Sequence, residues 1–212
     1  MNKKVLIPIF LLFPCLLTFT QNTDVELWLS ANIQKDFKKK IRLYYEQGYR
    51  RDHDLKETKT FYFETGGLYK PWKFLWVGPY YRYFDDFKGS NKSHLTGVLI
   101  LREELGRFDL KSKTRYIYEF SRGNKSDNFL RERLTASYDI PNFKFNPFLS
   151  SEFIFHIQPD KTENEEIRLD AGFERSFGKH HDIEVWYRYN IERNVNNPTN
   201  SHIIGIDYIF GF

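Results

Sequence analysis

Charged side chains that recur at every second position give this sequence its candidate chemistry. A β-strand places successive side chains on opposite faces, so residues two apart share a face. Arginine and glutamate gathered on one inward face could line a selective polar pore, or could pair as salt bridges and fill a narrow interior. The length of these side chains favours filling. The candidate inward-facing residues are Arg42, Glu46, Arg50, Glu64, Arg82, Arg102, Glu104, Arg115, Glu119, Arg131, Arg133, Glu152, Arg168, Glu174, Glu184 and Arg188.

One stretch indicates how such a filling would be built. Arg115 and Glu119 share a face but lie roughly 13 Å apart along a strand, so each needs partners on neighbouring strands. We expect Glu119 to pair with Arg131 or Arg133. We expect Arg115 to pair with Glu104. In a narrow, poorly hydrated interior such pairs depend strongly on one another, whereas in a wide aqueous pore water solvates each charge.

Two Ser-His dipeptides could supply the nucleophile and base of a hydrolase. They are Ser93-His94 and Ser201-His202. Both lie in strand-like stretches, where adjacent residues point to opposite faces, so neither pair can share a hydrogen bond while extended. Polar residues at strand edges explain these dipeptides better, and we assign no catalytic residue.

Two histidine-containing clusters, Asp52-His53-Asp54 and His180-His181, could contribute metal ligands. A zinc or calcium site needs a fuller ligand set, held in a defined framework, than either cluster offers. Exposed loop polarity is therefore the favoured interpretation of both clusters. We expect neither a metal nor any other cofactor.

The composition indicates one all-β domain. The chain has 212 residues, of which 18% are aromatic and 1 is methionine, and its mean hydropathy is -0.60. It is too polar for a helical membrane protein and too aromatic for a disordered chain, but it fits strands in which every second residue is polar. Without Lys3 and Lys4, the 32 basic residues become 30 against 28 acidic ones. This near balance argues against a nucleic-acid partner.

Residues 1–20 have the features of a secretory signal peptide. Two lysines precede an apolar run from Val5 to Phe19, and small residues flank a cleavage position before Gln21. The barrel domain would therefore comprise residues 21–212. The only cysteine, Cys15, lies inside the signal segment, and the proline before it disfavours lipidation. The mature chain would then contain no disulfide.

Alternation of apolar and polar residues extends along almost the whole mature chain. No stretch after Gln21 reaches the ~18 apolar residues of a spanning helix, so the pattern predicts a transmembrane, antiparallel, up-and-down β-barrel. The candidate strands are Val25–Gln34, Ile41–Arg50, Thr58–Tyr69, Trp72–Phe84, His94–Leu105, Phe108–Phe120, Asn128–Tyr138, Phe145–Ile157, Glu166–Phe177, Ile183–Ile191 and Ser201–Phe212.

These candidates predict a barrel of 10–12 strands. Because single-chain bacterial barrels have an even number of strands, we expect ten or twelve, with Val25–Gln34 the segment most readily left out of the wall. Short and long polar connections alternate along the chain. Tight turns face the periplasm in such barrels and longer loops face outward, so the C-terminus would face the periplasm.

The last strand carries the strongest indication of cellular location. Tyr208, Phe210 and Phe212 lie on one face, at the C-terminus of the chain. This pattern resembles the closing strand of bacterial outer-membrane barrels, whose assembly machinery reads a terminal aromatic residue. The resemblance implies a Gram-negative outer-membrane location, with membrane lipid and the assembly machinery as partners.

Several spaced motifs resemble a Bacteroidetes-type barrel family that is catalogued as domain of unknown function 2490. They are W-x-S-A-N at Trp28, R-E-E at Arg102, K-x-K-x-R-Y-x-Y-E-F at Lys111, R-E-R-L at Arg131 and V-W-Y-R-Y-N at Val185. Together with a strand that contains His202, they cover nearly all of the mature chain. The resemblance implies an outer-membrane barrel, and it supplies no activity or catalytic residue.

The sequence therefore predicts a monomeric outer-membrane barrel of structural or transport type. It could be a small passive channel with a charged and largely filled lumen. Two alternatives remain open, a barrel-embedded lipid hydrolase or acyltransferase and a secreted soluble barrel that binds an apolar ligand. A Ser-His-acid cluster near the outer rim would favour the enzyme, and an apolar interior would favour the soluble binder.

Overall fold

The computed structural model of the protein describes residues 23–87, 89, 91–121 and 125–212. The signal peptide predicted for residues 1–20 lies outside this part of the chain. Every regular element in the described residues is a β-strand. None of these residues forms a helix long and apolar enough to cross a membrane.

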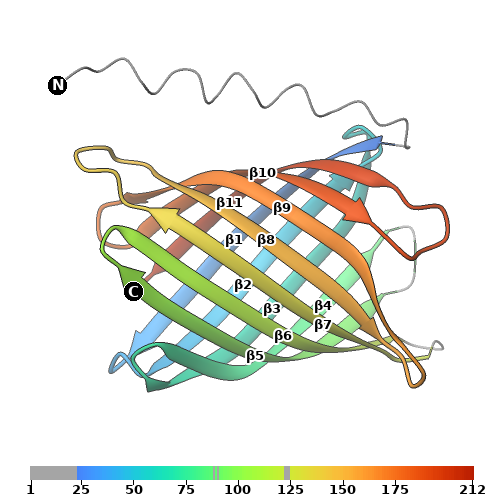
Figure 1. The fold of residues 1–212 in the computed structure, drawn as a ribbon, viewed down its shortest axis with the longest axis horizontal. Helices are drawn as coiled ribbons and strands as arrows, with labels where there is room; N and C mark the ends of the chain where they lie inside the picture. The colour runs from blue at the N-terminus through green and yellow to red at the C-terminus, as the bar shows by residue number, and fades with distance from the viewer. Residues whose placement is uncertain (1–22, 88, 90, 122–124) are drawn as a thin grey trace.

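Eleven strands account for the fold (Figure 1). Alternation of side chains, many of them β-branched or aromatic, favours the extended conformation over these ranges. The strands are β1 (Thr23–Phe37), β2 (Ile41–Asp52), β3 (Glu57–Trp72), β4 (Leu75–Asp86), β5 (Lys92–Leu105), β6 (Phe108–Ser121), β7 (Asp127–Tyr138), β8 (Asn146–Ile157), β9 (Thr162–Phe177), β10 (His181–Glu192) and β11 (Asn200–Gly211).

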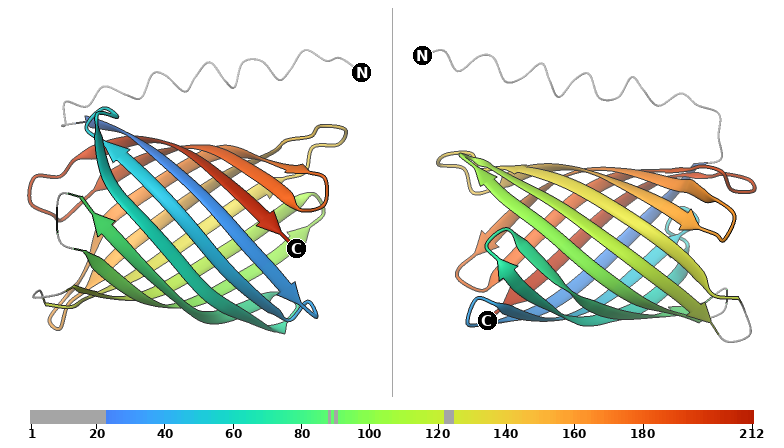
Figure 2. Two further views of the ribbon diagram at one scale, coloured as in Figure 1. Left: turned by 180° about the vertical axis from the view of Figure 1, so that it is seen from behind. Right: turned by 60° about the horizontal axis from the view of Figure 1, so that its bottom comes forward.

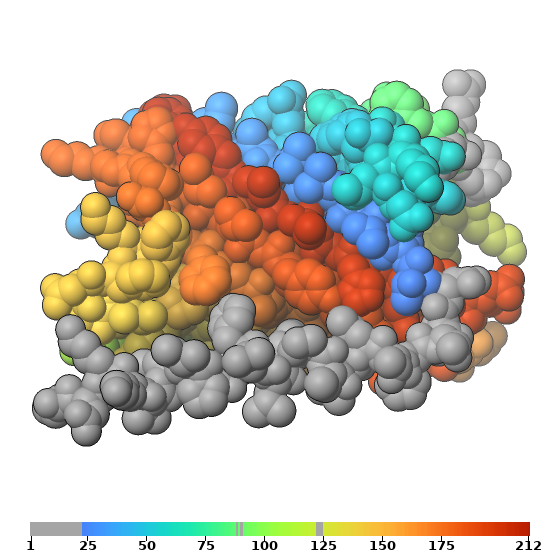
Figure 3. All heavy atoms as spheres, turned by 90° about the horizontal axis from the view of Figure 1, so that it is seen from above, coloured from blue at the N-terminus to red at the C-terminus, as the bar shows by residue number. Residues whose placement is uncertain are grey.

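Each strand pairs antiparallel with the next one, and β1 closes the barrel by pairing parallel with β11. The closing pair runs in register from Thr23 opposite Asn200 to Gln34 opposite Gly211. Figure 3 shows β11 and β1 side by side on one face of the molecule. The predicted all-β barrel of ten to twelve strands is confirmed.

The expectation of an even strand number is wrong, because the structure has eleven strands and the first candidate segment forms part of the wall. Chain direction reverses at every hairpin, so an odd number brings the first and last strands together running the same way. A parallel pair still satisfies its backbone groups, although its hydrogen bonds are slanted.

The two ends of the barrel differ in their connections (Figure 2). We call one end the turn rim, where Phe212 lies with connections 38–40, 73–74, 106–107, 139–145 and 178–180. Gly106 and Gly178 adopt φ of 65° and 68° there, a conformation that glycine accepts without strain. The opposite end is the loop rim, where β2 leads to β3, β4 to β5, β6 to β7, β8 to β9 and β10 to β11. The predicted contrast in length is reduced, because β3, β5 and β9 extend further into the expected loops.

The two faces of the wall differ in polarity. Outward positions carry exposed apolar side chains, such as Leu43 (51% exposed), Leu95 (53%) and Leu149 (65%). Inward positions carry most of the charged residues together with two small apolar clusters. One cluster centres on Leu68, Tyr80 and Val98, and the other on Phe148, Trp186 and Ile203.

Candidate functional site

The candidate site is a cavity of about 440 Å³ inside the barrel. Inward-facing residues of the turn-rim half line it. On β6 the lining comprises Asp109, Lys111, Lys113 and Arg115, and it ends before Ile117. Lys111 faces inward and is nevertheless exposed, so this half of the interior is open to solvent.

The loop-rim half of the interior is filled with side chains. Its inward residues contribute nothing to the lining of the cavity, and many of them are buried. Because the same alternation continues through both halves, the difference arises from how the side chains pack. The buried inward residues of this half include Glu26, Thr60, Thr96, Ile117, Ile154, Asn190 and Ser201.

A layer of five arginines separates the two halves. We call it the arginine layer, and its members are Arg50, Arg82, Arg131, Arg168 and Arg188. Trp28 is a central contact of this layer. The Cζ atoms of Arg50, Arg188 and Arg168 lie 3.9, 5.1 and 5.5 Å from the ring centroid of Trp28. Guanidinium groups stack favourably on an indole ring, and the interaction strengthens when both partners are desolvated.

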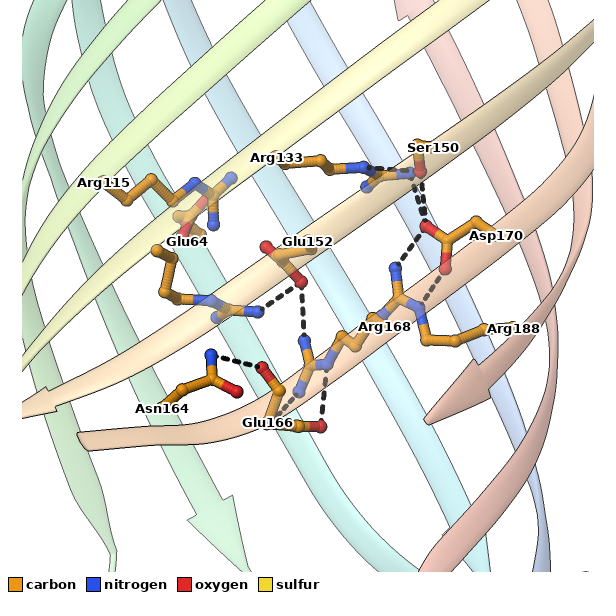
Figure 4. Close-up of polar contacts among 11 residues, drawn as sticks. Glu64, Arg115, Arg133, Ser150, Glu152, Asn164, Glu166, Arg168, Asp170 and Arg188 are labelled. Atoms are coloured by element: carbon orange, nitrogen blue, oxygen red, sulfur yellow. Dashed lines mark hydrogen bonds and ion pairs between the residues drawn. The ribbon is translucent and has the colours of Figure 1, made fainter. Parts of the chain in front are cut away.

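Carboxylates on β8 and β9 hold two members of the arginine layer in place (Figure 4). Arg131 and Arg168 each donate a hydrogen bond of 3.0 Å to Oε2 of Glu152. Arg168 also forms two bonds, of 2.8 and 2.9 Å, with the carboxylate of Glu166. Charge-assisted and paired bonds of this kind fix the position of a guanidinium group.

Asp170 is bonded by several side chains of this network (Figure 4). Its side chain has 0% exposed surface. It accepts two bonds from Arg188, of 2.6 and 2.9 Å, and one of 2.8 Å from the hydroxyl of Ser150. Arg133 approaches within 2.9 Å from the cavity side. Burial of a charge is tolerated here because several donors replace water.

A second network lies on β2, β3, β4 and β6. Arg82 donates a 2.7 Å bond to Glu64, which is only 2% exposed, and Arg115 lies 3.8 Å from the other oxygen of Glu64. Glu46 accepts a 2.7 Å bond from the hydroxyl of Tyr62 and lies 3.5 Å from Arg82. The contact from Arg115 joins strands that are not neighbours in the wall, so it crosses the interior.

The structure places the predicted inward residues in four environments. All except Glu64, Glu104 and Glu119 line the cavity. Glu64 is buried behind the lining, and Glu104 lies at the turn rim with its side chain 77% exposed. Glu119 lies near the loop rim, half-buried among other residues.

The expected partners of Glu119 and Arg115 are wrong. Glu119 pairs with Lys92 and His94, each at 2.7 Å, because β5 places His94 directly opposite it. Arg115 pairs with Glu64 rather than Glu104. The partner of Glu119 depends on strand register, and the partner of Arg115 depends on a contact across the interior. Alternation along one strand predicts neither register nor such a contact.

Sequence reasoning missed several members of the site, among them Trp28, Lys111, Lys113 and Asp170. A signal was present for each of these residues. Lys111 and Lys113 alternate with Arg115, and Asp170 alternates with Arg168. Trp28 stands among polar residues of β1, where an aromatic side chain on the inward face marks a packing position.

The Ser-His dipeptides do not form catalytic pairs. Ser93 contacts the hydroxyl of Tyr81, whereas His94 faces Glu119 on the other side of the wall. His202 contacts the hydroxyl of Tyr187 at 2.6 Å. As the alternation predicted, each serine and its adjacent histidine lie on opposite faces of their strand.

One histidine-containing cluster does come together at the loop rim. Asp24, Asp52 and His53 bring ligand atoms within 4.8 Å of one another. The carboxylate of Asp24 already accepts the backbone N–H groups of His53 and Asp54, at 3.1 and 2.9 Å. The cluster therefore caps the β2–β3 turn, in which residues 53–55 adopt positive φ.

Comparison with known proteins identifies the family. A family model described as "Protein of unknown function (DUF2490)" matches residues 25–201. Comparison with curated proteins and with solved structures gave no match. Since the matched residues cover most of the chain and extend from β1 into β11, the predicted membership in the family of domain of unknown function 2490 is confirmed. The chain belongs to the DUF2490 family of proteins of unknown function.

Proposed function

We propose that this protein is a monomeric outer-membrane β-barrel of structural or transport type whose lumen is closed at the loop rim. One observation carries the proposal: the barrel is apolar outside and charged inside. Exposed apolar residues cover the outer wall, while arginine and carboxylate side chains fill or line the interior. This polarity suits a barrel surrounded by lipid, and it is the reverse of a soluble barrel that encloses an apolar ligand.

The dimensions of the wall support the proposal. The strands contain between 12 and 16 residues. A tilted strand needs roughly 9–11 residues to cross the hydrocarbon core of a bilayer. Each strand is therefore long enough to cross and to extend into the headgroup region.

The signal segment and the last strand would provide for export and for assembly into the outer membrane. Residues 1–20 would direct export, and Tyr208 and Phe210 on β11, with Phe212 directly after it, would be read by the assembly machinery of the outer membrane. The turn rim would then face the periplasm and the loop rim the exterior. In this orientation the cavity opens toward the periplasm.

The arginine layer supports a closed lumen rather than a passive channel. Guanidinium groups, tryptophan and buried carboxylates form a continuous set of contacts from β4 through β1 to β7. Beyond the layer, on the side of the loop rim, inward residues do not line the cavity, and many of them are buried. We therefore propose that the cavity in the turn-rim half, which would open to the periplasm, is the functional part of the interior.

Membrane fractionation and electrical recording together test the proposal. We expect the full chain to fractionate with the outer membrane, to show heat-modifiable gel mobility and to give conductance near zero in planar bilayers. Recovery in the soluble periplasmic fraction after osmotic shock would refute the membrane location. Steady conductance of the unaltered protein would refute the closed lumen alone.

A further inference from the structure

The cavity has one strongly basic wall. Lys111, Lys113 and Arg115 occupy consecutive inward positions of β6. On β7, Arg133 lies directly opposite Lys113 and Arg131 directly opposite Arg115. Like charges placed directly opposite one another across two strands are destabilising. The positive charge concentrated on this wall therefore favours an anion beside it.

The two lysines of this wall form no close ion pair with a carboxylate. Among the described residues, neither Lys111 nor Lys113 forms an ion pair within 4.0 Å, whereas Arg115, Arg131 and Arg133 each do. The Nζ atom of Lys113 lies 5.6 Å from the ring centroid of Tyr80. The ammonium groups therefore remain available to a ligand in the cavity.

The same cavity has an acidic pair on another part of its wall. Glu174 of β9 and Glu184 of β10 lie directly opposite each other in register, and both line the cavity. Neither forms an ion pair within 4.0 Å in the described part of the chain. Strands β7 and β8 separate the basic β6 from β9. Two opposed sets of unpaired charges thus face one cavity.

We propose that this cavity binds a small zwitterionic solute. Its phosphate or carboxylate group contacts Lys111 and Lys113, and its ammonium group contacts Glu174 and Glu184. A simple anion would be repelled by the glutamate pair and a simple cation by the basic wall, so a ligand with both charges fits best. Tyr80 lies beside Lys113 and forms part of the cavity wall. The inference rests on the proposed closed lumen, which makes the cavity a binding site rather than a passage.

Calorimetric titration of the full chain in a non-ionic detergent at low ionic strength tests the proposal. The probes are O-phosphoethanolamine, β-alanine, inorganic phosphate and ethanolamine. We expect saturable binding of at least one zwitterion, about tenfold tighter than phosphate or ethanolamine. The two zwitterions distinguish a phosphate from a carboxylate ligand. Phosphate binding as tight as both zwitterions, or no saturable binding of either zwitterion, would overturn the proposal.

Charge-neutral variants locate the site. The double variant Lys111→Gln and Lys113→Gln should weaken zwitterion binding about tenfold or more. Glu174→Gln with Glu184→Gln should also weaken zwitterion binding but should strengthen phosphate binding. As a matched control, Lys38→Gln with Lys39→Gln alters two exposed lysines of the β1–β2 turn and should change neither affinity. Equal affinities in all three variants would refute this site.

Two checks distinguish loss of binding from misfolding of a variant and from a wrong membrane location. Gel mobility before and after heating shows whether each variant is folded. If the double lysine variant does not fold, the single variant Lys113→Met replaces it in the binding experiment. Outer-membrane fractionation is measured separately. A correctly fractionated, non-conducting barrel that binds no zwitterion would refute the ligand and leave the membrane proposal intact.

Discussion

The arginine layer at the boundary and the turn-rim half of the barrel interior use charged residues in opposite ways. At the boundary, arginines and carboxylates are paired, and three of the arginines stack on Trp28. In the turn-rim half, Lys111, Lys113, Glu174 and Glu184 line a cavity of about 440 Å³ and form no ion pair within 4.0 Å among the described residues. Alternation supplies charged side chains to both regions, so composition alone does not distinguish structural from functional charge. The distinction lies in which charges find partners.

The largest effect should come from removing a carboxylate at the boundary between the two halves. Asp170→Asn leaves the buried Arg188 without its anion, and such a loss costs about 3–5 kcal/mol of unfolding free energy. We expect this decrease in chemical unfolding of the detergent-solubilised barrel.

An exposed aspartate provides the matched control for that variant. Asp36 accepts two bonds from Arg42, of 2.6 and 2.8 Å, in a geometry close to that of Asp170 with Arg188, but its side chain is 41% exposed. Asp36→Asn should therefore cost about 1 kcal/mol or less. Equal losses for the two variants would show that water reaches both pairs and that the interior is not divided.

The next effect concerns the boundary itself. Trp28→Ala removes the ring shared by Arg50, Arg168 and Arg188, and truncation of a packed tryptophan costs about 3 kcal/mol or more. We also expect measurable conductance in planar bilayers, because the arginine layer loses its centre. Trp72→Ala is the control, since that residue is 60% exposed at the turn rim. An unstable Trp28→Ala barrel that still conducts nothing would show that the buried loop-rim residues close the lumen by themselves.

A smaller effect is expected at Glu119, near the loop rim. Its partner Lys92 is 44% exposed, so the pair is partly solvated. Glu119→Gln should lower the unfolding free energy by about 1 kcal/mol and leave conductance unchanged. A loss as large as that of Asp170→Asn would extend the buried network to the rim of the barrel.

The smallest effect should come from the unpaired lysines. Lys111→Gln with Lys113→Gln removes two charges that form no close ion pair and that lie opposite other cations, Arg102 for Lys111 and Arg133 for Lys113. Stability should stay within about 0.5 kcal/mol of the unaltered protein, which is typical of side chains outside packed networks. A clear loss in the same unfolding experiment would mean that these lysines are structural and would assign both regions the same role.

The sequence was sufficient for the faces of the strands but not for the partners of the charges. Alternation placed Arg50, Glu152 and Arg188 on the inward face because side-chain direction depends only on position along one strand. The pairing of Glu119 with His94 depends on register, and the contact of Arg115 with Glu64 depends on closure of the barrel. Both are properties of strands far apart in the chain.

The strand number could not be derived for a different reason. The expectation of an even number came from other barrels, whereas hydrogen bonding requires only that every edge be paired. An alternation count already gave eleven segments. The parallel partner of β1 could not be identified from β1 itself, because its register is set by residues at the other end of the chain.

That parallel seam has a consequence for folding kinetics. Every other pair in the wall is a hairpin between consecutive strands, but the seam joins residues such as Ser30 and Asp207, which are 177 positions apart. Closing so long a loop carries the largest entropic cost of any contact in the barrel, so it should form last. Until then β1 and β11 are unpaired edges, and a nascent chain with two such edges is most exposed to aggregation immediately before closure.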